Sequence, residues 1–224
     1  MNIGIVITGI ITDQYLNELI NCYKYCNYAK IISTWNYIDK CIIDRLKDEH
    51  FIIVQSKFPE NIFKTSVNFQ NYSCLKGIEY AESVGITHVL RMRADMECND
   101  ICGLLEIYKK IYETKKLIFL LHYHHNYPIG YLIDYVHFGS TYDSKKYICN
   151  FQVNGDNRFA EQFRQEMCYL TSDLNIINNY VVYSGKHLIE NGIEMSYTKP
   201  EYRHYTNLIK HLNDVNTSVG CDSF

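Results

Sequence analysis

The sequence lacks the features that divide a chain or anchor it in a membrane. It has 3 prolines in 224 residues, and no Pro-rich or Ser/Gly-rich stretch interrupts it. Because domain boundaries usually fall in such stretches, we expect a single domain over residues 1–224. No apolar run approaches the roughly 20 residues that span a bilayer, and no basic segment precedes the first apolar run. We therefore predict neither an integral membrane segment nor a signal peptide.

An excess of positive charge is also missing. The chain has 22 Lys and Arg against 25 Asp and Glu, a formal net charge of −3. Since proteins that bind the nucleic-acid backbone usually carry a strongly basic domain or stripe, we expect no nucleic-acid partner. The 9 cysteines are an odd number without an export signal, which favours reduced, packed thiols and a cytoplasmic location.

Three glycine-containing signatures of common enzymes are absent. The sequence has no GxGxxG fingerprint, no GxxxxGK[ST] loop and no GxSxG elbow. Dinucleotide-dependent dehydrogenases, P-loop NTPases and α/β-hydrolases therefore lose their main support. Function has to be sought in other residues.

What is present is an alternation of two patterns. Short apolar runs typical of buried strands alternate with segments whose apolar residues recur at helical spacing. Strands are predicted at 3–7, 30–34, 51–54, 87–93 and 117–121, with helices at 13–23, 38–46, 66–84 and 101–111. This order predicts an α/β fold with a Rossmann-like, doubly wound, mostly parallel sheet flanked by helices. Later in the chain, strands at 131–139 and 180–184 and a helix at 159–170 are expected.

Polar residues stand at the ends of three predicted strands. In open α/β sheets, ligands bind beyond the carboxyl ends of the strands. The candidate ligand residues are therefore Thr8, Gly9, Ser33, Thr34, Trp35, Arg91, Arg93 and Asp95. We expect all of them to open onto one rim of the sheet.

The sequence from Arg91 to Asp95 is the most informative part of this rim. Arg91, Arg93 and Asp95 alternate by two, so they point to the same side of the strand. A guanidinium recognises phosphate bidentately, and a carboxylate can hold Mg²⁺ or Mn²⁺ that bridges a diphosphate. The alternative is an Arg–Asp ion pair that only closes the strand.

Two further features allow more than one interpretation. His122, His124 and His125 follow a predicted strand, but alternation separates the last two and no carboxylate stands at ligand spacing, so we expect no metal cluster there. His137 stays a candidate contributor to the site. Trp35 either stacks on a base or sugar, or is a buried structural residue.

Several short motifs occur in a recognisable order along the chain. They are Ser33-Thr34-Trp35, Asn68 with Gln70, Arg91 with Arg93 and Asp95, Asp134 with Phe138, Gly139 and Asp143, and Glu161 with Gln162. In this order the chain resembles the WavE-type family of lipopolysaccharide-synthesis glycosyltransferases, which has relatives in large DNA viruses. It departs from that family where Thr8, Gly9 and Ile10 replace Gln-Gly-Pro, and where Ala160 replaces the proline before Glu161.

The resemblance implies a GT-A-like fold that moves a sugar from a nucleotide-sugar donor to a hydroxyl of a growing glycan. The nucleotide-binding half would be about residues 1–125 and the acceptor-side half about 126–224, in a bacterial or host cytoplasm. Asp95 stands where such enzymes carry the acid of a DxD motif, which implies a divalent metal, Mn²⁺ or Mg²⁺. A true DxD is absent, because Arg93 precedes Ala94.

The hypothesis assigns each candidate a role. Arg91 and Arg93 balance the charge of the departing diphosphate. Asp95 binds the metal or sugar hydroxyls, and Asp134 or Glu161 deprotonates the acceptor. The residues that cradle the nucleotide are Thr8, Gly9, Ser33, Thr34 and Trp35, with Asn68 and Gln70 toward the base.

Other function classes remain open at this stage. They are an inactive nucleotide- or glycan-binding module of the same fold, a nucleotidyltransferase and a structural protein. The sequence leaves the oligomeric state open.

Overall fold

The computed structural model describes residues 1–59, 66–112, 117–121, 132–148, 180–183, 190–193 and 195–197. Its centre is a 7-stranded sheet in the order β3-β2-β1-β4-β7-β6-β8, and β5 and β9 form a second, 2-stranded sheet. The strands are β1 (Ile3–Thr8), β2 (Ala29–Trp35), β3 (Ile52–Ser56), β4 (His88–Arg93), β5 (Met96–Cys98), β6 (Leu117–Leu121), β7 (Leu132–Ser140), β8 (Tyr180–Tyr183) and β9 (Met195–Tyr197). Within the large sheet only β7 runs against its neighbours, so the expected mainly parallel sheet is confirmed.

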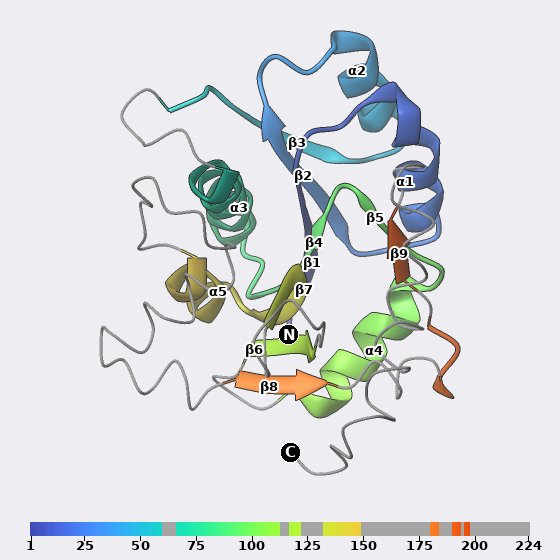
Figure 1. Ribbon diagram of the computed structural model, residues 1–224, viewed down its shortest axis with the longest axis vertical. Coiled ribbons are helices and arrows are strands. Elements are labelled where there is room, and N and C mark those ends of the chain that lie inside the picture. The colour runs from blue at the N-terminus through green and yellow to red at the C-terminus, as the bar shows by residue number, and fades with distance from the viewer. Residues whose placement is uncertain are drawn as a thin grey trace.

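Helices cover both faces of this sheet (Figure 1). On one face lie α3 (Ser66–Ser83) and α5 (Thr141–Ile148), and on the other lie α1 (Leu16–Tyr23), α2 (Lys40–Asp48) and α4 (Ile101–Ile111). Alternation along the strands produces two separate apolar layers. Val6 of β1 packs in the α3 layer, whereas its neighbours Ile5 and Ile7 pack in the opposite one. The predicted doubly wound arrangement is therefore confirmed.

Several element boundaries differ from the sequence prediction for local reasons. A 3₁₀ turn, η1 (Asp13–Tyr15), comes first, so the helix predicted from residue 13 becomes α-helical only at Leu16. Helix α4 begins at Ile101 as predicted, because the Asp100 side chain caps it by accepting a hydrogen bond from the Gly103 amide at 2.8 Å. The expected helix at 159–170 lies outside the described residues.

The start of α5 is fixed by the residue before it. It begins at Thr141, and the Ser140 hydroxyl accepts a hydrogen bond from the Asp143 amide at 3.0 Å. Ser140 therefore caps the start of α5.

The described cysteines are free thiols, most of them well covered. Cys22 on α1 accepts a hydrogen bond at its Sγ from the Cys98 amide at 3.2 Å, which joins α1 to the end of β5. Burial raises the pKa of Cys22 to about 12 and that of Cys26 to about 11. Because the thiolate is the reactive form, these thiols serve packing. None of the helices in the described part of the chain is long and apolar enough to cross a bilayer.

Helix α3 lies directly on β1 and β2 because Gly77 has no side chain. A Cβ atom at this position would stand 2.5 Å from Cγ1 of Val6 and 3.0 Å from Cβ of Ser33. Both distances are shorter than a packed interior tolerates. Gly77 thus sets how close α3 comes to the strands that end at the candidate site.

Replacing Gly77 with valine should force α3 away from the sheet. Because overpacking in a well-packed interior costs about 1–3 kcal/mol, we expect Gly77→Val to lower the free energy of unfolding by about 2 kcal/mol or more in urea denaturation. Glu79→Ala, on an exposed position of the same helix, is the control and should change it by less than about 0.5 kcal/mol. Equal stability of Gly77→Val and wild type would show that α3 does not need this close approach.

Candidate functional site

Three of the predicted rim residues lie in one row across the sheet. Thr8 at the end of β1 pairs with Ser33 of β2 on one side and with Arg93 of β4 on the other. Neighbours in register share a face of the sheet, and this face is the one covered by α3. Parallel pairing therefore brings the ends of β1, β2 and β4 together, but Thr8 and Ser33 are buried there instead of opening onto the rim.

The turn after β1 is held from both sides. Gly9 has φ +138°, a conformation that L side chains rarely adopt, and a Cβ there would lie 3.4 Å from Cβ of Ala94. The Thr34 hydroxyl donates to the Gly9 carbonyl at 2.8 Å, and the Ala94 amide donates to the Thr8 carbonyl at 2.8 Å. The Gly9 amide also donates to the Ser33 carbonyl at 3.4 Å, so the turn joins the ends of β1, β2 and β4, and its positive φ favours glycine.

Arg93 and Asp95 form a bidentate ion pair at this turn. Nε of Arg93 donates to Oδ1 of Asp95 at 2.8 Å, and Nη2 donates to Oδ2 at 2.6 Å. The Arg93 side chain is 30% exposed and that of Asp95 only 10%. The ion pair that the sequence left open is therefore present, and the guanidinium is its more accessible partner.

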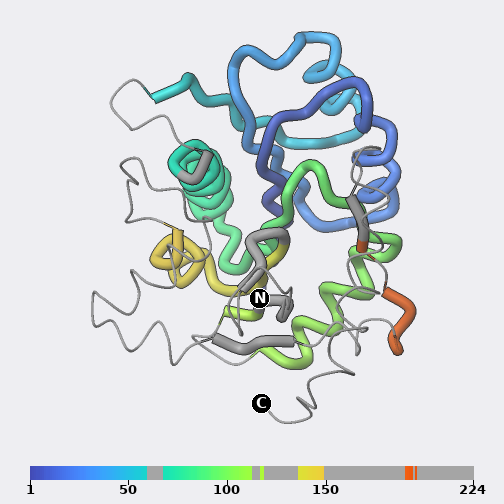
Figure 2. Tube along the Cα trace, viewed as in Figure 1, coloured from blue at the N-terminus to red at the C-terminus, as the bar shows by residue number. Residues whose placement is uncertain are grey.

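Tyr15 is a buried member of this cluster that the sequence reasoning missed. Its hydroxyl donates to the carbonyl of Ile10, which braces the turn after β1. Burial, reinforced by the negative charge of Asp95, raises the pKa of Tyr15 to about 12, although Thr12 and Arg93 act in the opposite direction. In Figure 2 strand β1 (blue) and strand β4 (green) run side by side. This pairing brings η1, which follows β1, toward the β4–β5 turn. Nothing in the spacing of Tyr15 could have indicated this contact.

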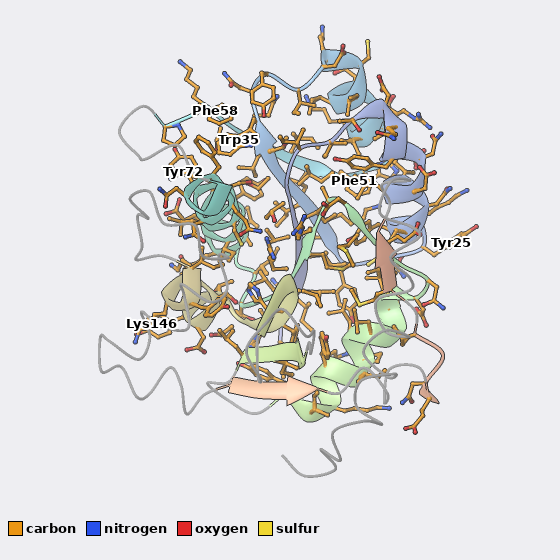
Figure 3. All side chains as sticks on the ribbon, in the orientation of Figure 1. Tyr25, Trp35, Phe51, Phe58, Tyr72 and Lys146 are labelled. Atoms are coloured by element: carbon orange, nitrogen blue, oxygen red, sulfur yellow. The ribbon has the colours of Figure 1, made fainter. Side chains whose placement is uncertain are left out.

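Ser33 and Trp35 are used in packing between β2 and α3. The Ser33 hydroxyl donates to the Ser73 carbonyl at 2.6 Å, and the Ser73 hydroxyl donates back to the Ser33 carbonyl at 2.9 Å. Trp35 is 3% exposed and stacks on Phe58 and Tyr72, with ring centroids 4.4 Å and 6.1 Å away (Figure 3). The tryptophan is thus a buried structural residue, and its stacking on Tyr72 packs the end of β2 against α3.

Arg91 lies one row deeper than Arg93. It pairs with Val6 of β1 and His137 of β7, and both Arg91 and His137 are buried. His137 meets Tyr147 of α5 edge to face, with ring centroids 6.0 Å apart. A positively charged residue and a histidine are therefore neighbours beneath the α5 side of the rim.

For the remaining predicted residues, the structure gives the element to which three of them belong, and the fourth lies outside the described residues. Asn68 is buried and Gln70 half-buried in the first turns of α3, and both make contacts there. Asp134 belongs to β7, the strand next to β4. Glu161 lies outside the described residues. The geometry therefore assigns no base.

A resident divalent cation at Asp95 does not fit the side chains present. Both of its oxygens already accept hydrogen bonds from Arg93. The Asp100 side chain caps α4. The described ranges contain no group of three or more His, Cys, Asp and Glu that could hold a metal ion. We therefore derive no catalytic step through a metal.

Comparison with known proteins shows similarity at the level of the fold. No protein-family model and no curated protein matches the sequence, so WavE-type membership stays a prediction. Residues 1–349 of S. aureus TarS, in complex with UDP-GlcNAc, match with TM-score 0.53 and 11% identity over 82% of this chain and 56% of that one. The glycosyltransferase GlyE of Streptococcus pneumoniae TIGR4 matches with TM-score 0.53 and 10% identity over 83% of this chain and 46% of that one.

A third solved structure matches over nearly the full length. It is described as a glucose-1-phosphate thymidylyltransferase of Bacillus anthracis in complex with sucrose, and it matches with TM-score 0.50 and 10% identity over 99% of this chain and 97% of that one. The chain spans about half the length of the TarS and GlyE chains. It has a mixed α/β fold of the GT-A-like kind, with a mainly parallel central sheet flanked by helices.

The Ser33–Ser73 contact can be tested by removing one hydroxyl. Ser33→Ala leaves the buried Ser73 carbonyl without that donor, so we expect the free energy of unfolding to fall by about 1–2 kcal/mol. Ser83→Ala, which removes an exposed hydroxyl from the same helix, should lower it by less than about 0.5 kcal/mol. If both variants unfold at the same urea concentration as wild type, the reciprocal bonds do not fix α3 to β2.

Proposed function

We propose that the protein transfers a sugar from a nucleotide-sugar donor to a hydroxyl group of a growing glycan. The observation that carries this proposal is the glycine turn at the end of β1, which lies directly beside the Arg93–Asp95 pair at the end of β4. Such a rim offers a guanidinium to a diphosphate, beside a glycine whose lack of a side chain lets a ligand come close. The fold neighbours support it, since one is a glycosyltransferase and another binds UDP-GlcNAc.

The donor nucleotide would be bound by the first two strand ends. The Oγ1 atom of Thr8 is buried and has no hydrogen-bond partner among the described residues, which is unusual unless a ligand or water supplies one. Gly9 lets a ligand approach the backbone. Thr34 holds the Gly9 carbonyl in place, while Ser33 and Trp35 support the rim from behind. Asn68 and Gln70 of α3 are proposed to reach the base.

The guanidiniums would act on the leaving group. In glycosyl transfer the bond from the sugar carbon to the diphosphate oxygen breaks while positive charge develops on the sugar. Arg93, supported by Arg91 one row deeper, would stabilise the negative charge that builds on the diphosphate. Asp95 orients Arg93 through both of its oxygens and is proposed to bind sugar hydroxyls. The acceptor oxygen forms the new bond, and its proton passes to Asp134 or Glu161 as the general base.

The first experiment measures binding and turnover together. The melting temperature is recorded with UDP, GDP, CDP, CMP and dTDP, because a ligand at about 100 times its Kd adds about 2.7 kcal/mol to the stability of the folded state. One nucleotide should raise it selectively. The corresponding nucleotide-sugar should then release its nucleotide in the presence of a glycan acceptor.

Asp95→Asn is the informative variant. It should stay folded, with a lower melting temperature because the bidentate pair is lost, and it should lower turnover by about 10²–10³-fold because the guanidinium loses its charged partner. Asp48→Asn, on an exposed position at the end of α2, is the matched control and should keep full turnover. Binding without turnover would favour an inactive binding module, and pyrophosphate release from a nucleoside triphosphate would favour a nucleotidyltransferase. Insensitivity to every nucleotide would contradict both enzyme proposals.

A further inference from the structure

The carboxylate of Asp95 is already bound by a cation that belongs to the protein. A fork-to-fork pair between guanidinium and carboxylate is among the strongest hydrogen-bonded ion pairs, and both of its bonds are short here, at 2.8 Å and 2.6 Å. A divalent cation on the same two oxygens would have to displace Arg93 or lie against its positive charge. Asp95 therefore offers a metal ion little free negative charge.

Relative exposure decides which partner an incoming ligand meets. The Asp95 side chain is one-third as exposed as that of Arg93, and its position after β4 places it near the buried hydroxyl of Tyr15. Arg93 is thus the more exposed partner of the pair. An anion approaching the glycine turn meets the more exposed Arg93 side chain, whereas both carboxylate oxygens of Asp95 already accept hydrogen bonds from Arg93.

The charged residues near Asp95 also disfavour the binding of a divalent cation. Arg91 lies two residues earlier on the same face of β4, so guanidiniums outnumber carboxylates between positions 91 and 95. Of the nearby acids, Asp100 is committed to the cap of α4, and Glu97 stands on β5 in its pairing with β9. The local charge therefore favours a diphosphate and disfavours a divalent cation.

We infer that this site binds the diphosphate of its nucleotide ligand without a divalent metal, because Arg93 takes the position at Asp95 that a metal ion would otherwise occupy. The inference rests on the proposed function, since it concerns the same donor site. It replaces the expectation of Mn²⁺ or Mg²⁺ that the resemblance implied. Asp95 then serves to position Arg93.

The wild-type test uses two measurements. Titration calorimetry with the nucleoside diphosphate that raises the melting temperature is run in EDTA and again in Mn²⁺ or Mg²⁺. The Kd should agree within about twofold, and the electron paramagnetic resonance signal of free Mn²⁺ should not decrease when protein alone is added. A Kd at least tenfold weaker in EDTA, or tight Mn²⁺ binding by the protein alone, would overturn the inference but leave the proposed donor site intact. Absence of nucleotide binding under every condition would overturn both.

Variants of Arg93 should make nucleotide binding depend on a divalent metal. Arg93→Gln removes the guanidinium and leaves Asp95 open, so nucleotide affinity in EDTA should fall at least tenfold and be partly restored by Mn²⁺. The double variant Arg93→Gln with Asp95→Asn should lose that restoration. Arg45→Gln, a change of the same type on α2, should bind like wild type with and without metal. If Arg93→Gln keeps wild-type affinity in EDTA, Arg93 does not perform the role assigned to it.

Discussion

The parallel register of β1 with its two neighbours is the constraint on which the rest of the structure depends. Because β1 pairs with both β2 and β4, Thr8 is aligned with Ser33 and Arg93 in a single row. The hydrogen bond from the Ala94 amide to the Thr8 carbonyl continues this alignment past the end of the strands. A shift of β4 by one residue would turn Arg93 to the opposite face and separate it from the glycine turn.

Residues near the rim divide into those that face it and those that hold it in place. Gly9 allows the turn and the partly exposed Arg93 carries charge beside it, whereas Ser33, Trp35 and Gly77 hold α3 against the strands. The second group contacts no proposed ligand atom. It acts by keeping three strand ends within reach of one another, which is how a rigid scaffold orients a binding site.

Much of this arrangement could be predicted from local patterns. Apolar runs predicted the parallel strands, and the polar residues at their ends predicted the rim. The parts that could not be predicted depend on contacts between distant segments. β7 enters the sheet between β4 and β6 in the antiparallel direction, and the three-residue β5 pairs with β9 almost 100 residues later. Neither pairing leaves a periodic pattern in the sequence.

The partners of single side chains in the site could not be predicted from the sequence either. Alternation predicts Arg93 and Asp95 on one side of a strand, whereas β4 ends at Arg93 and Asp95 lies in the turn that follows. Spacing alone also cannot decide whether they bind a ligand or each other. Tyr15 shows only a position in a helical segment, and its contact with the turn arises from the path of the chain through η1. The partner of Ser33 is a backbone carbonyl of α3, which no side-chain pattern reveals.

Hydrogen–deuterium exchange with mass spectrometry tests most directly whether the turns after β1 and β4 bind the nucleotide. Exchange is compared with and without the nucleoside diphosphate that raises the melting temperature. Bound nucleotide should slow exchange at the turn of residues 9–12 and at residues 93–96, because these two adjoining segments form the proposed site. Exchange should not change at α2, which lies on the face of the sheet opposite α3. Slower exchange confined to segments away from both turns would contradict the placement of the site.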